Sequence, residues 1–226
     1  MAIVCGMETA QIRDALADAL SGRHLLTHPF YRRWEDGTLA DGELAAYAEQ
    51  YRLIEQALPV TLSAIAAGLP DGRARALVEA NLADELGVPA PHAALFETFA
   101  QAAGAGSVVV SATTATAALL HAVRVASSTD PAAALAMVAA YEVQAADIAA
   151  SKGDGLRRHY GMDAAGTQFW DVHATQESAH ADWSIDALAA LDADPAAVCA
   201  AARIAADAWW AFLDEREALA PEVAAC

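Results

Sequence analysis

Apolar residues recur at helical spacing along almost the whole chain, and the breaks between the periodic segments are short. Glycine, proline and small polar residues mark these breaks. The pattern predicts helices over residues 8–20, 28–37, 41–68, 71–87, 92–103, 111–125, 131–152, 164–190 and 195–219. We expect Pro59 to kink the third helix, and Gly153 and Gly155 to end the seventh at Lys152. The run of valines at 108–110 is too short to anchor a sheet.

This succession of helices predicts an all-α protein. Alanine accounts for 62 of the 226 residues and aromatic residues for only 7%. Such a composition suits helices packed through small side chains better than it suits a sheet. No linker or repeat marks a domain boundary, so we expect one helical-bundle domain over residues 1–226.

Charge and hydropathy exclude several classes of protein. The net charge of −17 opposes binding to nucleic acid or to an anionic membrane, since both require a basic surface. No stretch of roughly 18 or more apolar residues runs uncharged, so the sequence predicts no membrane span. The first residues do not resemble a signal peptide, and we expect a cytoplasmic protein. Cys5, Cys199 and Cys226 are far apart and odd in number, which is typical of free thiols.

One late segment places three potential metal ligands on a single helix face. His173, Glu177 and His180 fall within about 60° of one another around a helix. Two imidazoles and a carboxylate suit iron, manganese or zinc, and such groups are poor core residues unless they are paired or coordinated. A ferritin-like site would need a second Glu-x-x-His pair besides Glu177 and His180, so it is disfavoured. Each histidine alone is as often an ordinary surface residue, and the interpretation depends on further ligands.

Three more residues look out of place and complete a ligand set. Glu142 lies in an otherwise apolar helix, and Glu85 and His92 flank Pro89 and Pro91, which oppose a continuous helix. We therefore expect a turn between Glu85 and His92 that orders when metal binds. Three carboxylates and three imidazoles could hold two iron ions and leave room for dioxygen or a substrate. The six candidates are Glu85, His92, Glu142, His173, Glu177 and His180.

Lys152 is the only lysine among the 13 basic residues. Lysine differs from arginine because its amine can lose a proton and react. The lone lysine is therefore either a chance survivor on a solvated face or a residue required as an amine, and composition leaves both open. On a straight helix Lys152 lies about 16 Å from Tyr141 along the axis. It would approach a site beside Glu142 only if the helix bent or ended early, which Gly153 permits.

Further motifs accompany the ligand set in a specific order and spacing. They are His28-Pro-Phe-Tyr31-Arg-Arg-Trp34-Glu-Asp-Gly37-Thr-Leu, Tyr47-Ala-Glu-Gln-Tyr51, Asp84-Glu85-Leu-Gly87 with His92, Ala140-Tyr141-Glu142-Val-Gln144, Lys152 with Gly155-Leu156 and Tyr160-Gly161, and Phe169-Trp170 ahead of His173. In these motifs the chain resembles, over residues 10–190, the heme-oxygenase-like di-iron oxidases, relatives of the PqqC and TenA proteins.

The resemblance implies a single seven-helix heme-oxygenase-like bundle with a non-heme metal site in its middle. It also implies two iron(II) ions as cofactor and dioxygen as co-substrate, and the six candidates match the family's ligands by position. The family usually has aspartate where this chain has Glu177, and the longer side chain moves the carboxylate by about one bond length. Occupancy of a second metal position is thereby left open, as is a mixed manganese–iron pair.

Within the family the chain is most similar to the CADD group, which makes para-aminobenzoate for folate synthesis. That similarity implies that Tyr31 supplies the ring, that Lys152 donates the nitrogen, and that Tyr141 lies near the site. The function expected first is therefore an iron- and dioxygen-dependent oxidase that acts on a small molecule or on its own tyrosine. We expect no nucleic-acid or membrane partner, and a homodimer as the commonest arrangement of soluble oligomers.

Three alternatives stay open on the sequence. A di-iron N-oxygenase, desaturase or carbon–carbon-cleaving oxidase of an amino acid or fatty acid would use the same ligands, and Glu55 could add a carboxylate unless it lies on a solvated helix face. A metal-free enzyme similar to PqqC or TenA is the second, although only Cys199 could serve as a TenA-like nucleophile. The third is a non-catalytic bundle that binds a partner protein, and this alternative leaves the six candidate ligands unexplained.

Overall fold

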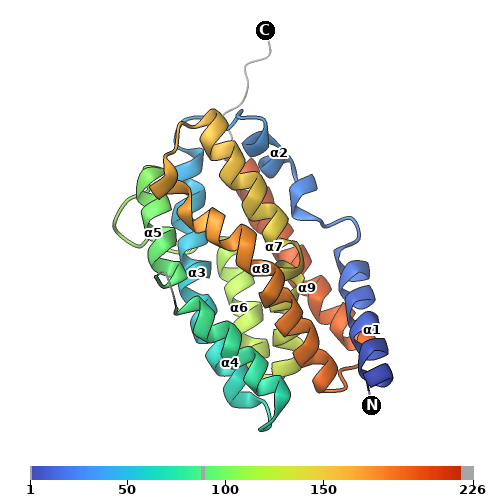
Figure 1. The fold of residues 1–226 in the computed structure, drawn as a ribbon. Helices are drawn as coiled ribbons and strands as arrows, with labels where there is room; N and C mark the ends of the chain where they lie inside the picture. The colour runs from blue at the N-terminus through green and yellow to red at the C-terminus, as the bar shows by residue number, and fades with distance from the viewer. Residues whose placement is uncertain (1, 88–89, 220–226) are drawn as a thin grey trace.

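The computed structural model describes residues 2–87 and 90–219, and over these ranges the chain is all-helical (Figure 1). It forms nine α-helices and one short 3-10 helix there, with no strand. The all-α prediction is therefore confirmed. The elements are α1 (Ala2–Leu20), η1 (Leu25–Thr27), α2 (Pro29–Glu35), α3 (Glu43–Gly68), α4 (Arg73–Glu85), α5 (His92–Ala102), α6 (Thr114–Thr129), α7 (Pro131–His159), α8 (Ala164–Ala190) and α9 (Pro195–Glu217).

The count of seven helices, which came from the family resemblance, is wrong for this chain. Local breaks explain the higher number. Pro29 starts the seven-residue α2, and Pro91, at the N-cap of α5, separates that helix from α4. The periodicity of the sequence, with its nine segments, is the better guide. Of the expected turn between Glu85 and His92, residues 88–89 lie outside the described ranges.

α7 continues past Lys152 to His159, so the prediction that glycines end this helix is wrong. Gly155 is required by packing and not by a turn. A Cβ atom there would lie 2.9 Å from Cδ1 of Trp34, closer than a methyl group can approach. Gly153 is less constrained, since the nearest atom to a Cβ built there is 3.4 Å away. Lys152 therefore sits inside a continuous helix.

α6 likewise extends beyond its predicted end, as far as Thr129. The hydroxyl of Ser127 donates to the carbonyl of Arg124 at 2.9 Å, and that of Thr129 donates to the carbonyl of Val125 at 2.8 Å. These bonds to the preceding turn accommodate polar residues within the helix. Residues 108–110 belong to neither a helix nor a strand, in agreement with the prediction.

Two hydrophobic clusters lie one after the other along the bundle, and α7 passes through both. The first is rich in alanine and includes residues 134–140 of α7; the second is aromatic and includes Ile148 and Leu156. α3 and α8 also contribute to both clusters, from opposite ends. The middle of these three helices therefore lies between the clusters, and Glu55, Glu142 and Glu177 are buried there.

α7 and α9 are each long and apolar enough, by composition, to cross a membrane, with a mean hydropathy of 1.3 over their most apolar stretch. In α7, 67% of that stretch is buried in the bundle, and in α9 44%. A helix that is hydrophobic on all sides is also what a buried core position requires. Packing inside the bundle accounts for the apolar character of α7.

Gly155→Ala is expected to destabilise the protein by about 1–3 kcal/mol, because the added methyl group would overlap Trp34. The matched Gly153→Ala change is expected to stabilise it by about 0.5–1 kcal/mol, because alanine is the better helix former and meets only ordinary contacts there. Urea unfolding followed by circular dichroism measures both. Stabilisation by both changes would contradict the packing role of Gly155.

Candidate metal centre

The six predicted ligands come from four helices and meet between the two hydrophobic clusters. Glu85 is the last residue of α4, His92 is the first of α5, and Glu142 lies in the middle of α7. All six are buried, with exposed fractions of 1–6%. The other three, from α8, are His173, Glu177 and His180.

Glu85 joins two groups of residues whose ligand atoms lie within 4.8 Å of one another, one with His92 and His173 and one with Glu177 and His180. Its Oε2 lies 2.9 Å from Nδ1 of His92, and its Oε1 lies 3.5 Å from Nδ1 of His180. Glu177 reaches a histidine with each oxygen, at 3.4 Å from Nε2 of His173 and 3.7 Å from Nδ1 of His180. The longer side chain in place of aspartate thus spans both groups.

Each histidine has one ring nitrogen beside an acceptor outside the ligand set. The pairs are His173 Nδ1 with Phe169 O at 2.8 Å, His180 Nε2 with Asp84 Oδ2 at 2.7 Å, and His92 Nε2 with Gln176 Oε1 at 3.1 Å. A nitrogen that donates to such an acceptor leaves the other with its lone pair for a metal. The roles of Asp84 and Gln176 were not predicted, although each directly precedes a predicted carboxylate ligand.

Glu142 lies beside the two groups and contacts a residue of α4. Its Oε1 accepts a hydrogen bond from Nδ2 of Asn81 at 2.7 Å, while its Oε2 has no hydrogen-bond partner among the described residues. Burial and the charge of Glu177 raise the pKa of Glu142 to about 7. A cation next to Glu142 would satisfy the unpaired oxygen and offset the repulsion between the two carboxylates.

Buried polar atoms at this site have few partners. In the part of the chain that the structure describes, Oε2 of Glu142 has no hydrogen bond, while Oε2 of Glu85 and Nδ1 of His92 have no hydrogen bond but face each other at 2.9 Å as an ion pair. A buried oxygen such as Oε2 of Glu142 costs about 1–3 kcal/mol when it stays unpaired. Burial also raises the pKa of Glu177, and the charge of Glu85 adds to the effect. Buried imidazoles and carboxylates that lack hydrogen-bond partners form a suitable site for a transition-metal ion such as iron.

Glu55 is a further buried carboxylate, with an exposed fraction of 4%. Burial, followed by the charges of Glu85 and Glu177, raises its pKa well above the usual value. Its interpretation as a residue on a solvated helix face is therefore wrong. Glu55 faces the same cavity as the predicted ligands.

Lys152 is buried in the aromatic cluster, with 1% of its surface exposed. Its Nζ donates to the hydroxyl of Tyr47 at 2.5 Å and lies 4.3 Å from the ring centroids of both Tyr31 and Trp170. Burial lowers its pKa well below the usual value. The side chain reaches Tyr31 without any break in α7, and burial favours the neutral form of its amine. The solvated-face interpretation of the lone lysine is wrong.

Four tyrosines form two hydrogen-bonded pairs near the ligands. The hydroxyls of Tyr31 and Tyr47 lie 3.0 Å apart, and those of Tyr51 and Tyr141 lie 2.8 Å apart. The rings of Tyr47 and Tyr51 stack with centroids 5.4 Å apart, which joins the two pairs. Burial raises the pKa of all four phenols, so they stay protonated. Tyr47 and Tyr51 were noted only as part of a motif, yet they connect Tyr141, next to Glu142, with Tyr31.

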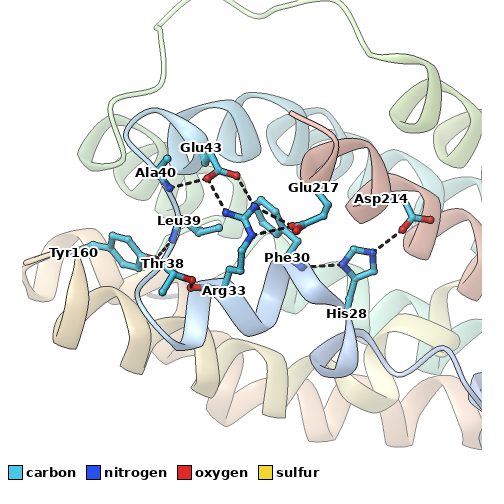
Figure 2. Close-up of polar contacts among 10 residues, drawn as sticks. All are labelled: His28, Phe30, Arg33, Thr38, Leu39, Ala40, Glu43, Tyr160, Asp214 and Glu217. Carbon is cyan, nitrogen blue, oxygen red and sulfur yellow. Dashed lines mark hydrogen bonds and ion pairs between the residues drawn. The ribbon is translucent and has the colours of Figure 1, made fainter. Parts of the chain in front are cut away.

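α2 carries Tyr31 and is anchored to α9 at its first turn (Figure 2). Nδ1 of His28 accepts a hydrogen bond from the backbone N–H of Phe30 at 3.1 Å, and Nε2 lies 3.0 Å from Oδ1 of Asp214. The N–H of Phe30 needs a neutral His28, since a protonated ring has no acceptor. Burial lowers the pKa of His28 and favours this form, although Asp214 acts in the opposite direction.

The last turn of α2 is held by Arg33, which Figure 2 shows between two glutamates. Arg33 donates to both oxygens of Glu43, at 2.7 and 2.9 Å, and to Oε2 of Glu217, at 2.9 and 3.0 Å. Glu43 starts α3 and Glu217 ends α9. A helix of seven residues is unstable alone. These contacts, with the hydrogen bond from Nε1 of Trp34 to the carbonyl of Lys152 at 3.2 Å, hold Tyr31 against Lys152.

A cavity of about 620 Å³ reaches the ligands from the side of α3 and α6. Glu85, Glu142, His173 and Glu177 line it at one end, and most of the remaining lining is apolar. Volumes of this size accept small organic molecules. The arrangement combines a candidate metal centre, two pairs of phenols beside a buried amine, and an access route.

Comparisons with known proteins point to one family. The model of a family described as iron-containing redox enzymes matches residues 45–210. A protein of Nitrosomonas europaea named 4-aminobenzoate synthase is 37% identical over 225 residues, 92% of each chain. A protein of the same name from Chlamydia pneumoniae is 29% identical over 206 residues, 88% of this chain and 92% of the other.

Solved structures with the same fold are distant in sequence. A CADD-like protein of Nostoc punctiforme superposes with a TM-score of 0.79 at 16% identity, covering 95% of this chain and 99% of the other. A TenA homologue of Pseudomonas syringae gives 0.76 at 16% identity, over 92% of each chain. A domain of Shewanella denitrificans described as having a heme oxygenase-like fold gives 0.71 at 14% identity, over 92% and 90%. These likenesses support the predicted fold family.

Loss of a predicted ligand is expected to lower the amount of iron that the protein retains. His173→Ala and Glu142→Ala should each weaken iron binding by at least about tenfold, because even outer residues of a metal site contribute that much. His24→Ala is the matched control, since His24 lies outside the site. Protein loaded with Fe(II) without oxygen and then desalted is measured by elemental analysis. Unchanged iron in both site variants would contradict the ligand assignment.

Acidification is expected to weaken the start of α2. Because the pKa of His28 is lowered from 6.5, the folded protein binds fewer protons there than the unfolded chain. The stability that neutral His28 contributes is thus present above pH 6.5 and is lost as the pH falls below it, by up to about 1.4 kcal/mol per pH unit.

His28→Asn isolates this effect, because asparagine still caps a helix but does not titrate near neutral pH. Urea unfolding of both proteins between about pH 7.5 and about pH 5.5 should show the wild type losing more stability than the variant. A wild-type advantage that is the same at both ends of this range would rule out the role of neutral His28.

Proposed function

The chain belongs to the family of iron-containing redox enzymes, and on this premise we propose that it is a non-heme di-iron oxidase that forms 4-aminobenzoate from its own Tyr31 and Lys152. The observation that carries the proposal is the position of Lys152, a buried amine with a lowered pKa, whose Nζ lies 4.3 Å from the centroid of the Tyr31 ring. The name of the relatives, 4-aminobenzoate synthase, supports the choice of product.

The product can be traced to these two side chains atom by atom. 4-Aminobenzoate carries a nitrogen and a carboxylate at opposite positions of a benzene ring, where tyrosine carries a hydroxyl and Cβ. The conversion breaks the Cα–Cβ bond of Tyr31, oxidises Cβ to a carboxylate and replaces the hydroxyl with Nζ of Lys152. If glycine remains at position 31 and an aldehyde on Cε of Lys152, the sum is a six-electron oxidation, with dioxygen as the acceptor and water as its product.

Iron would be held by the carboxylates and imidazoles of the candidate metal centre and, when bound, supplies the activation of dioxygen. The six residues proposed to hold it are Glu85, His92, Glu142, His173, Glu177 and His180. We propose two ions, because Glu177 reaches towards both His173 and His180, and Glu142 offers a further oxygen beside them. Asp84 and Gln176 orient the imidazoles from outside.

Lys152 acts as the nitrogen source because its environment removes the proton that would block the lone pair. An ammonium ion in the aromatic cluster would be desolvated, and the pKa is lowered accordingly. Tyr47 accepts a hydrogen bond from Nζ and so directs the amine. The rings of Tyr47 and Tyr51 stack between the two hydrogen-bonded pairs, so an electron can pass along all four phenols from Tyr141 to Tyr31, while a proton can move only within each pair.

A second candidate function is the oxidation of an external small molecule by the same centre, such as N-oxygenation, desaturation or carbon–carbon cleavage of an amino acid or fatty acid. The observation that favours it is the cavity, which brings an organic substrate to the ligands. Glu55, buried beside them, adds a carboxylate to that cavity.

The metal-free alternative has less support. Cys199 is half-buried and is not among the residues that line the cavity, so it has no access to a substrate there. It is a free thiol, as predicted, while Cys226 and the side chain of Cys5 lie outside the described residues. A metal-free enzyme, or a protein that only binds a partner, would also have to bury three carboxylates and three imidazoles with no metal to offset the free-energy cost of burying them.

The composition of the chain offers a direct test of the nitrogen source. Because Lys152 is the only lysine, protein produced with lysine labelled with nitrogen-15 at Nζ carries the label at a single residue. Incubation with Fe(II), a reductant and dioxygen should release 4-aminobenzoate that contains the label, detected by mass spectrometry. The peptide that contains Tyr31 and the peptide that contains Lys152 should each lose mass, to an extent that matches the amount of 4-aminobenzoate released.

Two variants control this experiment. Lys152→Arg and Tyr31→Phe should each abolish labelled product, whereas Tyr160→Phe, which alters a tyrosine hydrogen-bonded to the backbone N–H of Leu39 (Figure 2), should not. Unlabelled 4-aminobenzoate in the usual yield would sink the proposed use of Lys152. Oxidation of an added compound by Lys152→Arg at the wild-type rate would favour the second candidate instead.

A further inference from the structure

The cavity beside the metal centre has one buried end and one exposed end. The predicted ligands line the buried end, where they are 2–6% exposed. The opposite end is formed by residues of α3 and α6 that reach the surface, among them Val60, which is 71% exposed, and the exposed side chains of His121 and Arg124. A molecule that enters or leaves the cavity passes these residues.

Arg124 stands apart from most arginines of this acidic chain. Ten of the 12 arginines have a carboxylate oxygen within 4.0 Å, whereas Arg124 and Arg32 have none among the described residues. Nη2 of Arg124 donates instead to Nδ1 of His121, at 3.0 Å. With a net charge of −17 on the chain, an arginine without a carboxylate at a cavity mouth is available to an external anion.

The walls of the cavity favour a flat apolar body. Tyr51, Tyr141 and Trp209 line it, and the rings of Tyr141 and Trp209 stack with centroids 4.4 Å apart. Leu120 and Val123 line it from α6, the helix that carries Arg124. Aromatic faces of this kind accept another ring by stacking.

We propose that this cavity binds an aromatic monocarboxylate, with the ring among the aromatic side chains and the carboxylate on Arg124 at the mouth. The identity of the natural occupant rests on the proposed function: it is 4-aminobenzoate on its way out. Tyr31 and Lys152 are 2% and 1% exposed, so a product formed there needs a route to solvent. Tyr51 provides the junction, since its ring lies 5.1 Å from Nζ of Lys152 and also lines the cavity.

Calorimetric titration of iron-loaded protein without oxygen tests the site. 4-Aminobenzoate and benzoate should bind, and the neutral isostere benzamide should bind more weakly. Arg124→Gln should raise the Kd for benzoate about fivefold, as expected for an ion pair at an exposed site. Arg32→Gln is the matched control, since Arg32 is also exposed and unpaired but lies on α2, and it should leave the Kd unchanged.

Unchanged binding in Arg124→Gln would overturn the proposal, and it is the result expected if the carboxylate bound iron instead. Equal binding of benzamide, or tighter binding of octanoate than of benzoate, would overturn the assignment of ligand class. Ala117→Trp, which places a large side chain in the cavity wall, should abolish binding while the circular dichroism spectrum stays that of the wild type. Benzoate binding that persists in this variant would exclude the cavity.

Failure of this inference is distinguishable from failure of the proposed function. Labelled 4-aminobenzoate released by a protein that does not bind benzoate would overturn the cavity site and leave the reaction standing. Benzoate binding that depends on Arg124, in a protein that releases no labelled product, would support the site and overturn the reaction, with an external aromatic carboxylate as the occupant.

Discussion

Burial of charge between two hydrophobic clusters is the constraint on which the rest of this structure depends. Four glutamates and three histidines lie in one layer across α3, α4, α5, α7 and α8, each at most 6% exposed. An unpaired ion in such a place costs several kcal/mol. The pKa of Glu142 and that of Glu177 are raised by burial, which shows that the layer needs positive charge from protons or a metal. Because the ligands come from separate helices, a metal that binds here also fastens those helices together, and metal binding is coupled to stability.

Burial acts on Lys152 in the opposite direction, because it disfavours the positive charge of the amine. The described residues include no carboxylate within ion-pair distance of its Nζ, the hydroxyl of Tyr47 is its hydrogen-bond acceptor, and its pKa is lowered well below the usual value. A neighbouring carboxylate would have kept the amine protonated and unreactive. Arginine could not take this position, because a guanidinium does not lose its proton. The environment therefore explains why a chain that otherwise uses arginine keeps one lysine, and why that lysine is chemically available.

The convergence of the candidate ligands could be predicted from the sequence because charged residues on apolar helices are visible without a structure. Glu142 and the stripe from His173 to His180 needed only helical geometry. The surroundings of Lys152 could not be found that way, because distance along α7 says nothing about Tyr31 and Tyr47, which arrive from α2 and α3. Gly155 was misinterpreted for a similar reason: a glycine that ends a helix and one that admits Trp34 look the same in a sequence. Asp84 and Gln176 are ordinary polar residues until the fold places an imidazole beside them.

Tyr51 and Tyr141 divide the interior into two compartments with different chemistry. On one side lie Tyr31 and Lys152, closed to solvent and anchored through α2 to α3 and α9. On the other lies the cavity, open towards α6 and lined by the metal ligands. An enzyme that acted only on external substrates would not need the closed compartment around Tyr31 and Lys152. An enzyme that only consumed its own side chains would not need the open cavity. The proposed formation of an aromatic carboxylate in the first compartment, with its departure through the second, would use both, because the hydrogen-bonded phenols Tyr51 and Tyr141 lie where the two meet.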